Sequence, residues 1–255
     1  MRYFLKLAYN GQHYFGWQIQ ANAVSVQEVL TNAIQLLLKE KINLVGAGRT
    51  DTGVHAKEFY AHFDTQTCFD PTTKNNFLKR LNSFLPSNIV IYDMLPVKNS
   101  AHARFDAISR TYKYYVLTKK DPFLTDFAYR VFYPLDMKKM NDCCKKLMDY
   151  TDFTSFSKVH TQTLTNNCKI ASAHWEEQED GLLFFEITAD RFLRNMVRAI
   201  AGTLLDVGRG KLSIADFCTI IEQKDRCAAG TSVAAHALFL EKIVYPKDIW
   251  GKDEP

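Results

Sequence analysis

The sequence lacks the features that mark several common protein classes. No two of its six cysteines have the C-x-x-C spacing of zinc and redox sites, and its seven histidines form no H-E-x-x-H or comparable ligand set. No apolar run approaches the length that spans a membrane, and the residues at the N-terminal end lack the apolar core of a signal peptide. We therefore expect no metal, reduced thiols and a cytoplasmic location.

The composition is that of an ordinary globular protein. A chain of 255 residues forms one large domain or two of moderate size, and either buries an ample core without disulfides or metals. Apolar residues make up 47% and charged residues 24%. The formal net charge of +4 is compatible with an RNA partner, but many mildly basic proteins have no such partner. Bulk charge alone therefore does not assign a function.

Hydrophobic periodicity predicts an α+β pattern in which strand, helix and strand recur in both halves. Alternating or apolar runs predict strands over 2–9, 58–63, 89–97, 110–115, 168–177, 182–188 and 234–246. Amphipathic runs predict helices over 25–38, 73–84, 136–148 and 213–222, and a further helix that follows Asp190 as its N-cap. Ser25 and Glu28 have the spacing of a capping box. Neighbouring Cys143 and Cys144 are expected to be buried as small apolar residues.

Within the segment Gly46–Ala56, residues 48–53 read as a loop, because a strand pattern ends before them at Val45 and another begins after the segment at Glu58. The glycines of this segment are available for backbone angles that other residues resist and for the close approach of a ligand. They are Gly46, Gly48 and Gly53. This makes the loop a candidate site.

Arg49 and Asp51 are two residues apart on this loop. A neighbouring guanidinium keeps a carboxylate ionised, which suits a nucleophile better than a general acid. The competing interpretation is an ordinary turn, for which Asp and Thr beside Gly are common choices. A phosphate-binding loop is excluded by spacing, since no Gly-Lys-Ser/Thr ending occurs and the loop leads into a strand pattern instead of a helix.

The string from Gly48 to Ala56, Gly-Arg-Thr-Asp-Thr-Gly-Val-His-Ala, resembles the signature of the tRNA pseudouridine synthase A family. Members of that family isomerise uridine in the anticodon stem-loop of tRNA, at tRNA positions 38–40. The resemblance implies that Asp51 is the catalytic nucleophile. It also implies that Arg49 helps to fill the space left by a flipped nucleotide.

A second stretch resembles the same family in its order of Ala-Arg-Phe, at 103–105, followed by Arg-x-Tyr-x-Tyr, at 110–114. The match places Tyr112 against the target uracil, with its hydroxyl able to assist proton removal from C5. It also makes Arg104 a contact to the RNA backbone. Without the resemblance, a strand tyrosine such as Tyr112 is more simply a core aromatic residue.

A third match is Phe-Leu-Arg-Asn-Met-Val-Arg, at 192–198, followed by Gly202 and by Val-Gly at 207–208. In the family the last arginine of this string pairs with the catalytic aspartate, which assigns that role to Arg198. Helical spacing predicts that Arg191 and Arg194 lie on the same side as Arg198, and such a stripe is ordinarily just the solvated face of a helix. With the RNA substrate that the resemblance implies, we expect Arg191 and Arg194 to contact phosphate. The same spacing predicts a core side made of Leu193, Val197, Ile200 and Leu204.

Two weaker matches extend the resemblance from Tyr9 to Tyr245. Tyr-Asn-Gly at 9–11 and Tyr-Phe-Gly-Trp-Gln at 14–18 are similar to the family's opening motif, in which we expect Phe15 and Trp17 to belong to the core. The aromatic residues of 151–156 are expected to pack internally. Near the C-terminal end, Ala237 stands where the family has glycine, and its methyl group is expected to crowd a close backbone approach.

The resemblance implies an α+β fold of two similar halves, each a sheet with helices on one face, joined into a continuous, mainly antiparallel mixed sheet with a central cleft. It assigns residues 1–105 to the half with the aspartate loop and 106–255 to the half with the tyrosine strand and arginine helix. It further implies no cofactor and a homodimer that contacts one tRNA. Two alternatives remain, an RNA-binding module with a degraded site and another Asp-nucleophile enzyme such as a glycoside hydrolase. The latter typically needs a second carboxylate, and none is evident beside Asp51.

Overall fold

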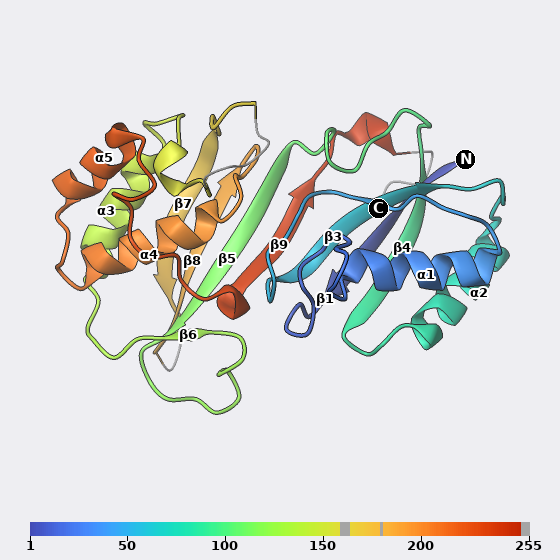
Figure 1. The fold of residues 1–255 in the computed structure, drawn as a ribbon, viewed down its shortest axis with the longest axis horizontal. Coiled ribbons are helices and arrows are strands. Elements are labelled where there is room, and N and C mark those ends of the chain that lie inside the picture. The colour runs from blue at the N-terminus through green and yellow to red at the C-terminus, as the bar shows by residue number, and fades with distance from the viewer. Residues whose placement is uncertain (159–163, 179–180, 251–255) are drawn as a thin grey trace. The chain divides into compact units, whose positions relative to one another are not determined.

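The chain forms two compact units in the computed structural model, which describes residues 1–158, 164–178 and 181–250. Met1–Ile108 and the segment from Leu240 onward make up the first unit, and Ser109–Phe239 makes up the second. Figure 1 shows the elements of each unit. The sequence-based division into domains 1–105 and 106–255 places the C-terminal segment in the other half, and as a division into domains it stays a prediction.

The sheet of the first unit has the strand order β4-β1-β3-β9. β1 (Arg2–Tyr9) pairs antiparallel with both β3 (His55–Asp64) and β4 (Ile89–Val97), and the two-residue β2 (Val45–Gly46) pairs with β3. β9 (Leu238–Val244) follows β3 in this order. β1 and β4 have the bounds that their apolar patterns predict, whereas the predicted strand at 234–246 is shorter because the 3-10 turn Ala235–Ala237 precedes it.

Two helices lie against this sheet (Figure 1), and each begins at a side-chain cap. α1 (Val26–Leu38) is capped by Ser25, whose hydroxyl accepts a hydrogen bond from the Glu28 backbone N–H, one half of the predicted capping box. α2 (Pro71–Phe84) begins two residues before the predicted start. The Asp70 carboxylate explains this, because it accepts from the backbone N–H groups of Thr72 and Thr73.

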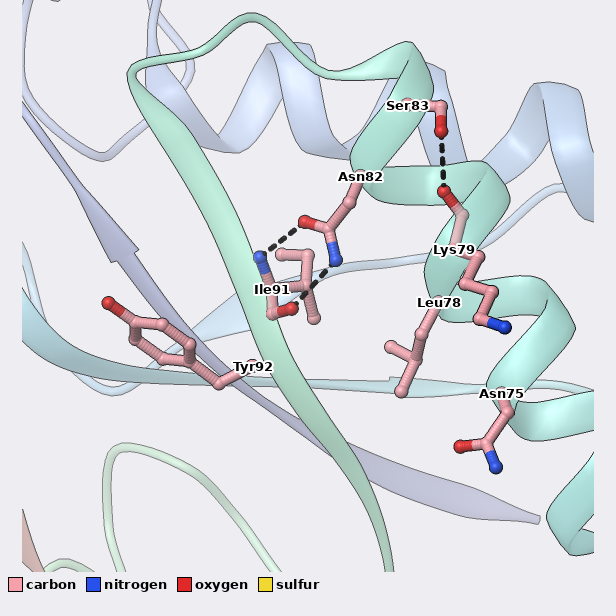
Figure 2. Close-up of a pocket in the computed structure, with 7 residues that line it drawn as sticks. All are labelled: Asn75, Leu78, Lys79, Asn82, Ser83, Ile91 and Tyr92. Atoms are coloured by element: carbon pink, nitrogen blue, oxygen red, sulfur yellow. Dashed lines mark hydrogen bonds between the residues drawn. The ribbon is translucent and has the colours of Figure 1, made fainter.

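The edge strand β4 is covered by a side chain of α2. The Asn82 amide donates to the Ile91 carbonyl and accepts from the Ile91 backbone N–H, both at 2.8 Å (Figure 2). One asparagine thus pairs both outward polar groups of Ile91. Beside it, an open recess of about 580 Å³ is lined by Asn75, Leu78, Lys79, Asn82, Ser83, Ile91 and Tyr92.

The sheet of the second unit has the order β5-β8-β7. β8 (Leu182–Ala189) pairs antiparallel with β5 (Ser109–Leu117) and with β7 (Ile170–Glu177), and the short β6 (Tyr129–Arg130) pairs parallel with β5. The predicted strands are therefore present. The hairpin turn predicted between β7 and β8 includes residues 179–180, which lie outside the described residues.

Three helices belong to the second unit: α3 (Met137–Leu147), α4 (Met196–Gly208) and α5 (Ile214–Gln223). α3 packs on β7, and α4 packs on α3 and α5. Cys143 and Cys144 on α3 are fully buried, as predicted. α5 begins with a complete capping box, in which the Ser213 and Asp216 side chains bond each other's backbone N–H groups.

Both units combine strands with helices, which confirms the predicted α+β class. Phe153 and Phe156, beside the 3-10 turn Thr154–Phe156, are fully buried, so the prediction that they pack internally is confirmed. A last 3-10 turn spans Lys247–Ile249. Along the described part of the chain, no helix combines the length and apolar character needed to cross a membrane.

Candidate active site

Asp51 lies on the loop between β2 and β3, as the sequence predicts. The Asp51 carbonyl accepts from the Val54 backbone N–H at 3.2 Å, which makes a tight turn, and the Gly53 N–H donates to the Tyr14 carbonyl at 3.2 Å. Asp51 is half-buried and Arg49 is exposed. The backbone around the carboxylate is therefore fixed while the arginine beside it faces solvent.

The segment 9–16 supports this loop from outside. The Tyr9 and Thr50 hydroxyls are hydrogen-bonded at 2.9 Å, and the Gly11 N–H donates to His55 Nδ1 at 3.1 Å. A Cβ on Gly11 would lie 1.9 Å from the Val54 carbonyl oxygen, and one on Gly16 would lie 2.3 Å from the Thr50 carbonyl oxygen. Gly16 also has a φ of +82°. Glycine at both positions lets two backbones meet without side chains between them.

The three loop glycines have different roles. Gly53 has a φ of +80°, which confirms the predicted need for an angle that other residues resist. A Cβ on Gly46 would lie 2.3 Å from the Trp17 indole nitrogen, whereas one on Gly48 would meet no atom within 4 Å. Gly46 therefore makes room for Trp17, and Gly48 faces open space.

The prediction for the opening motif is half correct. Trp17 is buried and its ring lies 4.2 Å from that of Phe59, measured between centroids. Phe15 is 51% exposed, so its assignment to the core is wrong. The physical reason is local: Phe15 lies on an irregular stretch outside any strand, where its N–H bonds the Val24 carbonyl, so no sheet face covers its side chain.

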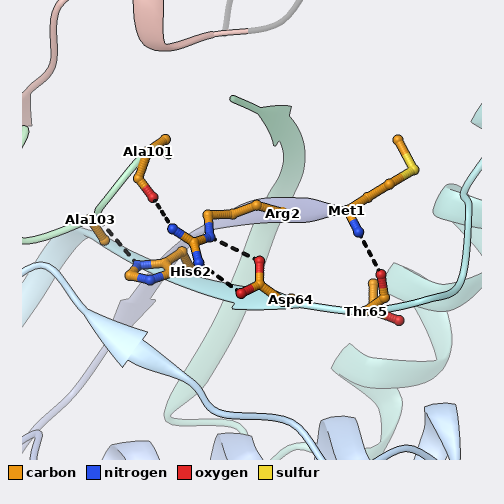
Figure 3. A network of polar contacts seen from close by, with 7 residues as sticks. All are labelled: Met1, Arg2, His62, Asp64, Thr65, Ala101 and Ala103. Carbon is orange, nitrogen blue, oxygen red and sulfur yellow. Dashed lines mark hydrogen bonds and ion pairs between the residues drawn. The ribbon is translucent and has the colours of Figure 1, made fainter. Parts of the chain in front are cut away.

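Arg104 lies on a segment that is held by contacts to β1 and β3 (Figure 3) and to Tyr245 in the C-terminal part of the first unit. Arg2 donates to the Ala101 carbonyl at 2.7 Å while its other nitrogens bond Asp64. The Ala103 N–H donates to His62 Nδ1 at 3.1 Å, and the Tyr245 hydroxyl donates to the Ala103 carbonyl. The Arg104 side chain is exposed and lies over the Phe105 ring, with its guanidinium carbon 5.4 Å from the centroid.

His62 acts here as a neutral acceptor. Burial lowers the pKa of His62 from its ordinary value of 6.5 to about 4, and the nearby Arg2 charge contributes in the same direction. An uncharged imidazole keeps a lone pair on Nδ1 for the Ala103 N–H. The position of the Arg104 segment therefore depends on this histidine staying unprotonated.

In the second unit, Tyr112 lies on β5 opposite Ile187 of β8. It is half-buried, and its ring meets that of Phe192 edge to face at 5.1 Å. Tyr114, on the same face of the strand, is fully buried, and its hydroxyl has no hydrogen-bond partner among the described residues. Burial raises the pKa of Tyr114, and the positive charge of Arg198 opposes that shift.

The helix predicted to follow Asp190 begins later than expected. α4 starts at Met196, because Asn195 has a left-handed φ of 68° that interrupts helical geometry. Asp190 is not an N-cap, since its Oδ1 accepts from the N–H groups of Lys169 and Arg191 in an irregular turn.

This start corrects the predicted arginine stripe. Arg191 and Arg194 precede the helix and do not share a helical face with Arg198. Arg191 is half-buried, and Arg194 is exposed while its carbonyl accepts from the Lys158 N–H at 3.1 Å. The predicted core side is confirmed, because four side chains are buried: Leu193, Val197, Ile200 and Leu204.

Arg198 lies in the first turn of α4 and is half-buried. Its Nε donates to the Val233 carbonyl at 2.7 Å, and the Val233 N–H donates to the Arg198 carbonyl at 3.3 Å. One turn further along α4, a Cβ on Gly202 would lie 2.1 Å from the Thr231 carbonyl oxygen. Gly202 thus lets an irregular segment lie close to the helix and bond Arg198, a partnership that no local pattern in the sequence signals.

The predicted site residues divide between the units. Asp51, Arg49 and Arg104 belong to the first unit. The second unit holds the others: Tyr112, Arg191, Arg194 and Arg198. None of them lines the recess beside Asn82. Among the described residues, no group of three or more His, Cys, Asp or Glu is placed to hold a metal ion.

A family model described as tRNA pseudouridine synthase matches residues 7–106 and 144–246. A protein of Parabacteroides distasonis named tRNA pseudouridine synthase A is 54% identical over 254 residues, which cover 99% of each chain. Proteins with the same name from Bacteroides fragilis and Clostridium acetobutylicum are 53% and 39% identical, and cover 98% and 94% of this chain and 98% of their own length.

The matched stretches include the Asp51 loop, the Arg104 segment and helix α4, while Tyr112 on β5 lies between them. The chain belongs to the tRNA pseudouridine synthase family.

Proposed function

We propose that this protein isomerises uridine to pseudouridine in the anticodon stem-loop of tRNA, at tRNA positions 38–40, with Asp51 as the nucleophile and without a cofactor. The observation that carries this proposal is the burial of Asp51 and the fixed backbone of its loop. Asp51 is half-buried on a loop whose backbone is held by two hydrogen bonds, from Gly53 to the Tyr14 carbonyl and from Val54 to the Asp51 carbonyl, and which lies close to Gly16. A nucleophile needs such a fixed position, since its attack geometry decides the rate.

The reaction exchanges one bond of ribose C1′ for another. The bond from C1′ to uracil N1 breaks, the ring turns, C1′ bonds to C5, and the proton on C5 leaves while N1 gains one. No atom is lost and no electrons are transferred to an outside acceptor. An aspartate adds to C1′ or to uracil C6 and holds one fragment while the other turns, and both routes require the same ionised carboxylate.

The remaining residues receive the roles that the family resemblance implies. Arg198 keeps the carboxylate of Asp51 ionised and oriented, and Tyr112 stacks on the uracil and assists removal of the C5 proton. Arg49 fills the space of the extruded nucleotide. Three further arginines contact RNA phosphate, where their charge attracts the substrate. They are Arg104, Arg191 and Arg194.

Extraction of the target uridine from its stack costs a few kcal/mol. Phosphate contacts and aromatic stacking offset that cost, and RNA shape is the main recognition cue. We place the enzyme in the cytoplasm, where its tRNA substrate occurs, and propose that it acts as a homodimer.

The test is tritium release from C5-labelled uridine in tRNA. Asp51→Ala is expected to abolish release, a loss of about 1,000-fold or more, while the dissociation constant for tRNA stays within about threefold. The control is Asp93→Asn, because Asp93 is a half-buried carboxylate of the same unit that pairs with Lys74. Turnover by Asp51→Ala would disprove the assignment of the nucleophile. Binding of tRNA by the wild type without any altered base would favour a binding module.

A further inference from the structure

An irregular segment of the second unit, residues 229–233, runs along the first turns of α4. The Gly230 N–H donates to the Thr203 hydroxyl at 3.0 Å, and Val233 exchanges two hydrogen bonds with Arg198. The bond from Arg198 Nε holds one edge of the planar, rigid guanidinium against the Val233 carbonyl. The direction of the Arg198 guanidinium is therefore set by where the Val233 carbonyl lies.

The Arg226 side chain forms hydrogen bonds with three residues of this segment. Arg226 Nη1 donates to the carbonyls of Ala229 and Gly230 at 3.4 and 3.3 Å, and Nη2 donates to the Ser232 hydroxyl at 2.8 Å. The Ser232 hydroxyl also accepts from the Asn195 side chain. Asn195 has a left-handed backbone and immediately precedes α4. Ser232, which Arg226 holds, thus bonds the residue before α4 and directly precedes Val233, the partner of Arg198.

The arrangement answers a physical need. Residues 229–233 belong to no helix or strand, so their carbonyl groups obtain no partners from a regular ladder. An arginine presents five N–H donors in a fixed plane, and so it can hold several acceptors of an irregular loop in one geometry. A lysine carries the same charge but offers no such fork.

We propose that Arg226 is a positioning residue for the reaction: by holding residues 229–233 in place, it fixes the Val233 carbonyl and through it the orientation of Arg198. This inference depends on the proposed function, because it assumes that Arg198 acts on the catalytic aspartate. Arg226 itself touches neither Arg198 nor substrate in this scheme. Its contribution appears in the chemical step and not in the affinity for tRNA.

The test compares Arg226→Met, which keeps most of the apolar stem, with Arg226→Lys, which keeps the charge without the fork. Arg209→Met is the matched control, since Arg209 caps the other end of α4, about three turns from Arg198, and bonds Asp206. Three quantities are measured: single-turnover tritium release, the dissociation constant for tRNA, and the hydrogen-exchange rate of the Arg198 Nε–H. The last uses protein with ¹⁵N-labelled arginine, and the signal is assigned from Arg198→Lys.

Arg226→Met is expected to slow tritium release by about 10- to 100-fold and to leave the tRNA dissociation constant within about twofold. Exchange of the Arg198 Nε–H should accelerate by about tenfold, because its acceptor is no longer held. Arg226→Lys should fall between Arg226→Met and the wild type, and Arg209→Met should change neither rate. A folded Arg226→Met with wild-type release overturns the inference, and so does a slower release with unchanged Nε–H exchange.

If Arg226→Met does not fold, Ser232→Ala carries the test, since it removes only one of the acceptors and is expected to give the same pattern at a smaller size. Failure of the proposed function gives a different result from failure of this inference. If the proposed function is wrong, the wild-type protein makes no pseudouridine. If only this inference is wrong, the wild type is active and the Arg226 variants do not show the expected changes in release and exchange.

Discussion

The loop of Asp51 and the helix of Arg198 are held in different ways. The loop is fixed by backbone contacts to residues 11–16, and glycines make those contacts possible. The start of the helix is fixed by the irregular segment 229–233. Arg226, about 30 residues further along the chain than the helix start, holds that segment by hydrogen bonds. Adding a methyl group to a glycine should disrupt the loop contacts, and removing the arginine's hydrogen-bond donors should disrupt the segment beside α4. Substitutions can therefore test the two arrangements separately.

The largest effect is expected from Gly16→Ala. The new methyl group would meet the Thr50 carbonyl at a φ of +82°, so the free energy of unfolding should fall by about 3 kcal/mol. Gly48→Ala, on the Asp51 loop itself, is the matched control, because its methyl group meets nothing within 4 Å, and its change should stay within about 0.5 kcal/mol. Urea unfolding measures both. Equal losses would mean that residues 9–16 do not support the loop.

The second region is tested by Tyr112→Phe, since Tyr112 packs on Phe192 just before α4. Loss of the hydroxyl should slow release of the C5 proton by about 100-fold with little change in tRNA affinity. Tyr114→Phe, on the same strand face, removes a hydroxyl that has no partner among the described residues, and so should leave the rate unchanged. Wild-type release by Tyr112→Phe would leave Tyr112 as a stacking residue only.

Gly202→Ala should have a smaller effect on the rate. Its methyl group would push residues 229–233 away from α4, and we expect about a tenfold slower single-turnover release with a stability loss of about 1–3 kcal/mol. Gly208→Ala, at the far end of the helix, meets the flexible end of Met140 and should lose stability without losing rate. A normal rate in Gly202→Ala would show that close contact with α4 is not needed to orient Arg198.

The smallest effect is expected on how the free energy of unfolding depends on pH. It concerns the Arg104 segment, which is held in part by His62 and not by close glycine contacts or by a single arginine. The pKa of His62 is about 4 in the folded protein, below its ordinary value of 6.5, so folding favours the neutral form. The stability that this provides is present above pH 6.5 and is lost as pH falls toward 4. In urea unfolding between pH 7 and pH 5, His62→Gln should lose less stability than the wild type. Parallel losses would contradict the role of a neutral His62.

Local patterns in the sequence predicted the regular elements and the position of the Asp51 loop. β1 and β4 have the predicted bounds, because each is a run of largely apolar residues that the sheet buries over much of its length. The family resemblance, carried by short strings around Asp51, Tyr112 and Arg198, supplied the roles that periodicity alone does not contain.

What the sequence did not predict depends on backbone geometry and distant contacts. Asn195 reads as an acceptable helix residue, and only its left-handed φ reveals that Arg191 and Arg194 precede α4. Phe15 reads as core, but an irregular turn directs it outward. Arg226 has no motif-like neighbours, because its acceptors are mostly carbonyl groups, which every residue possesses.

The amide of Asn82 has a consequence for how this protein behaves at high concentration. An outermost strand normally offers unpaired groups on which a foreign strand can be templated, the first step toward fibrous deposits. On β4 that template is interrupted at Ile91, where one side chain imitates the neighbour that an intruding polypeptide would supply. Asn82→Ala would therefore leave the Ile91 backbone groups open to pairing with another chain and should promote aggregation, while the catalytic rate stays unchanged.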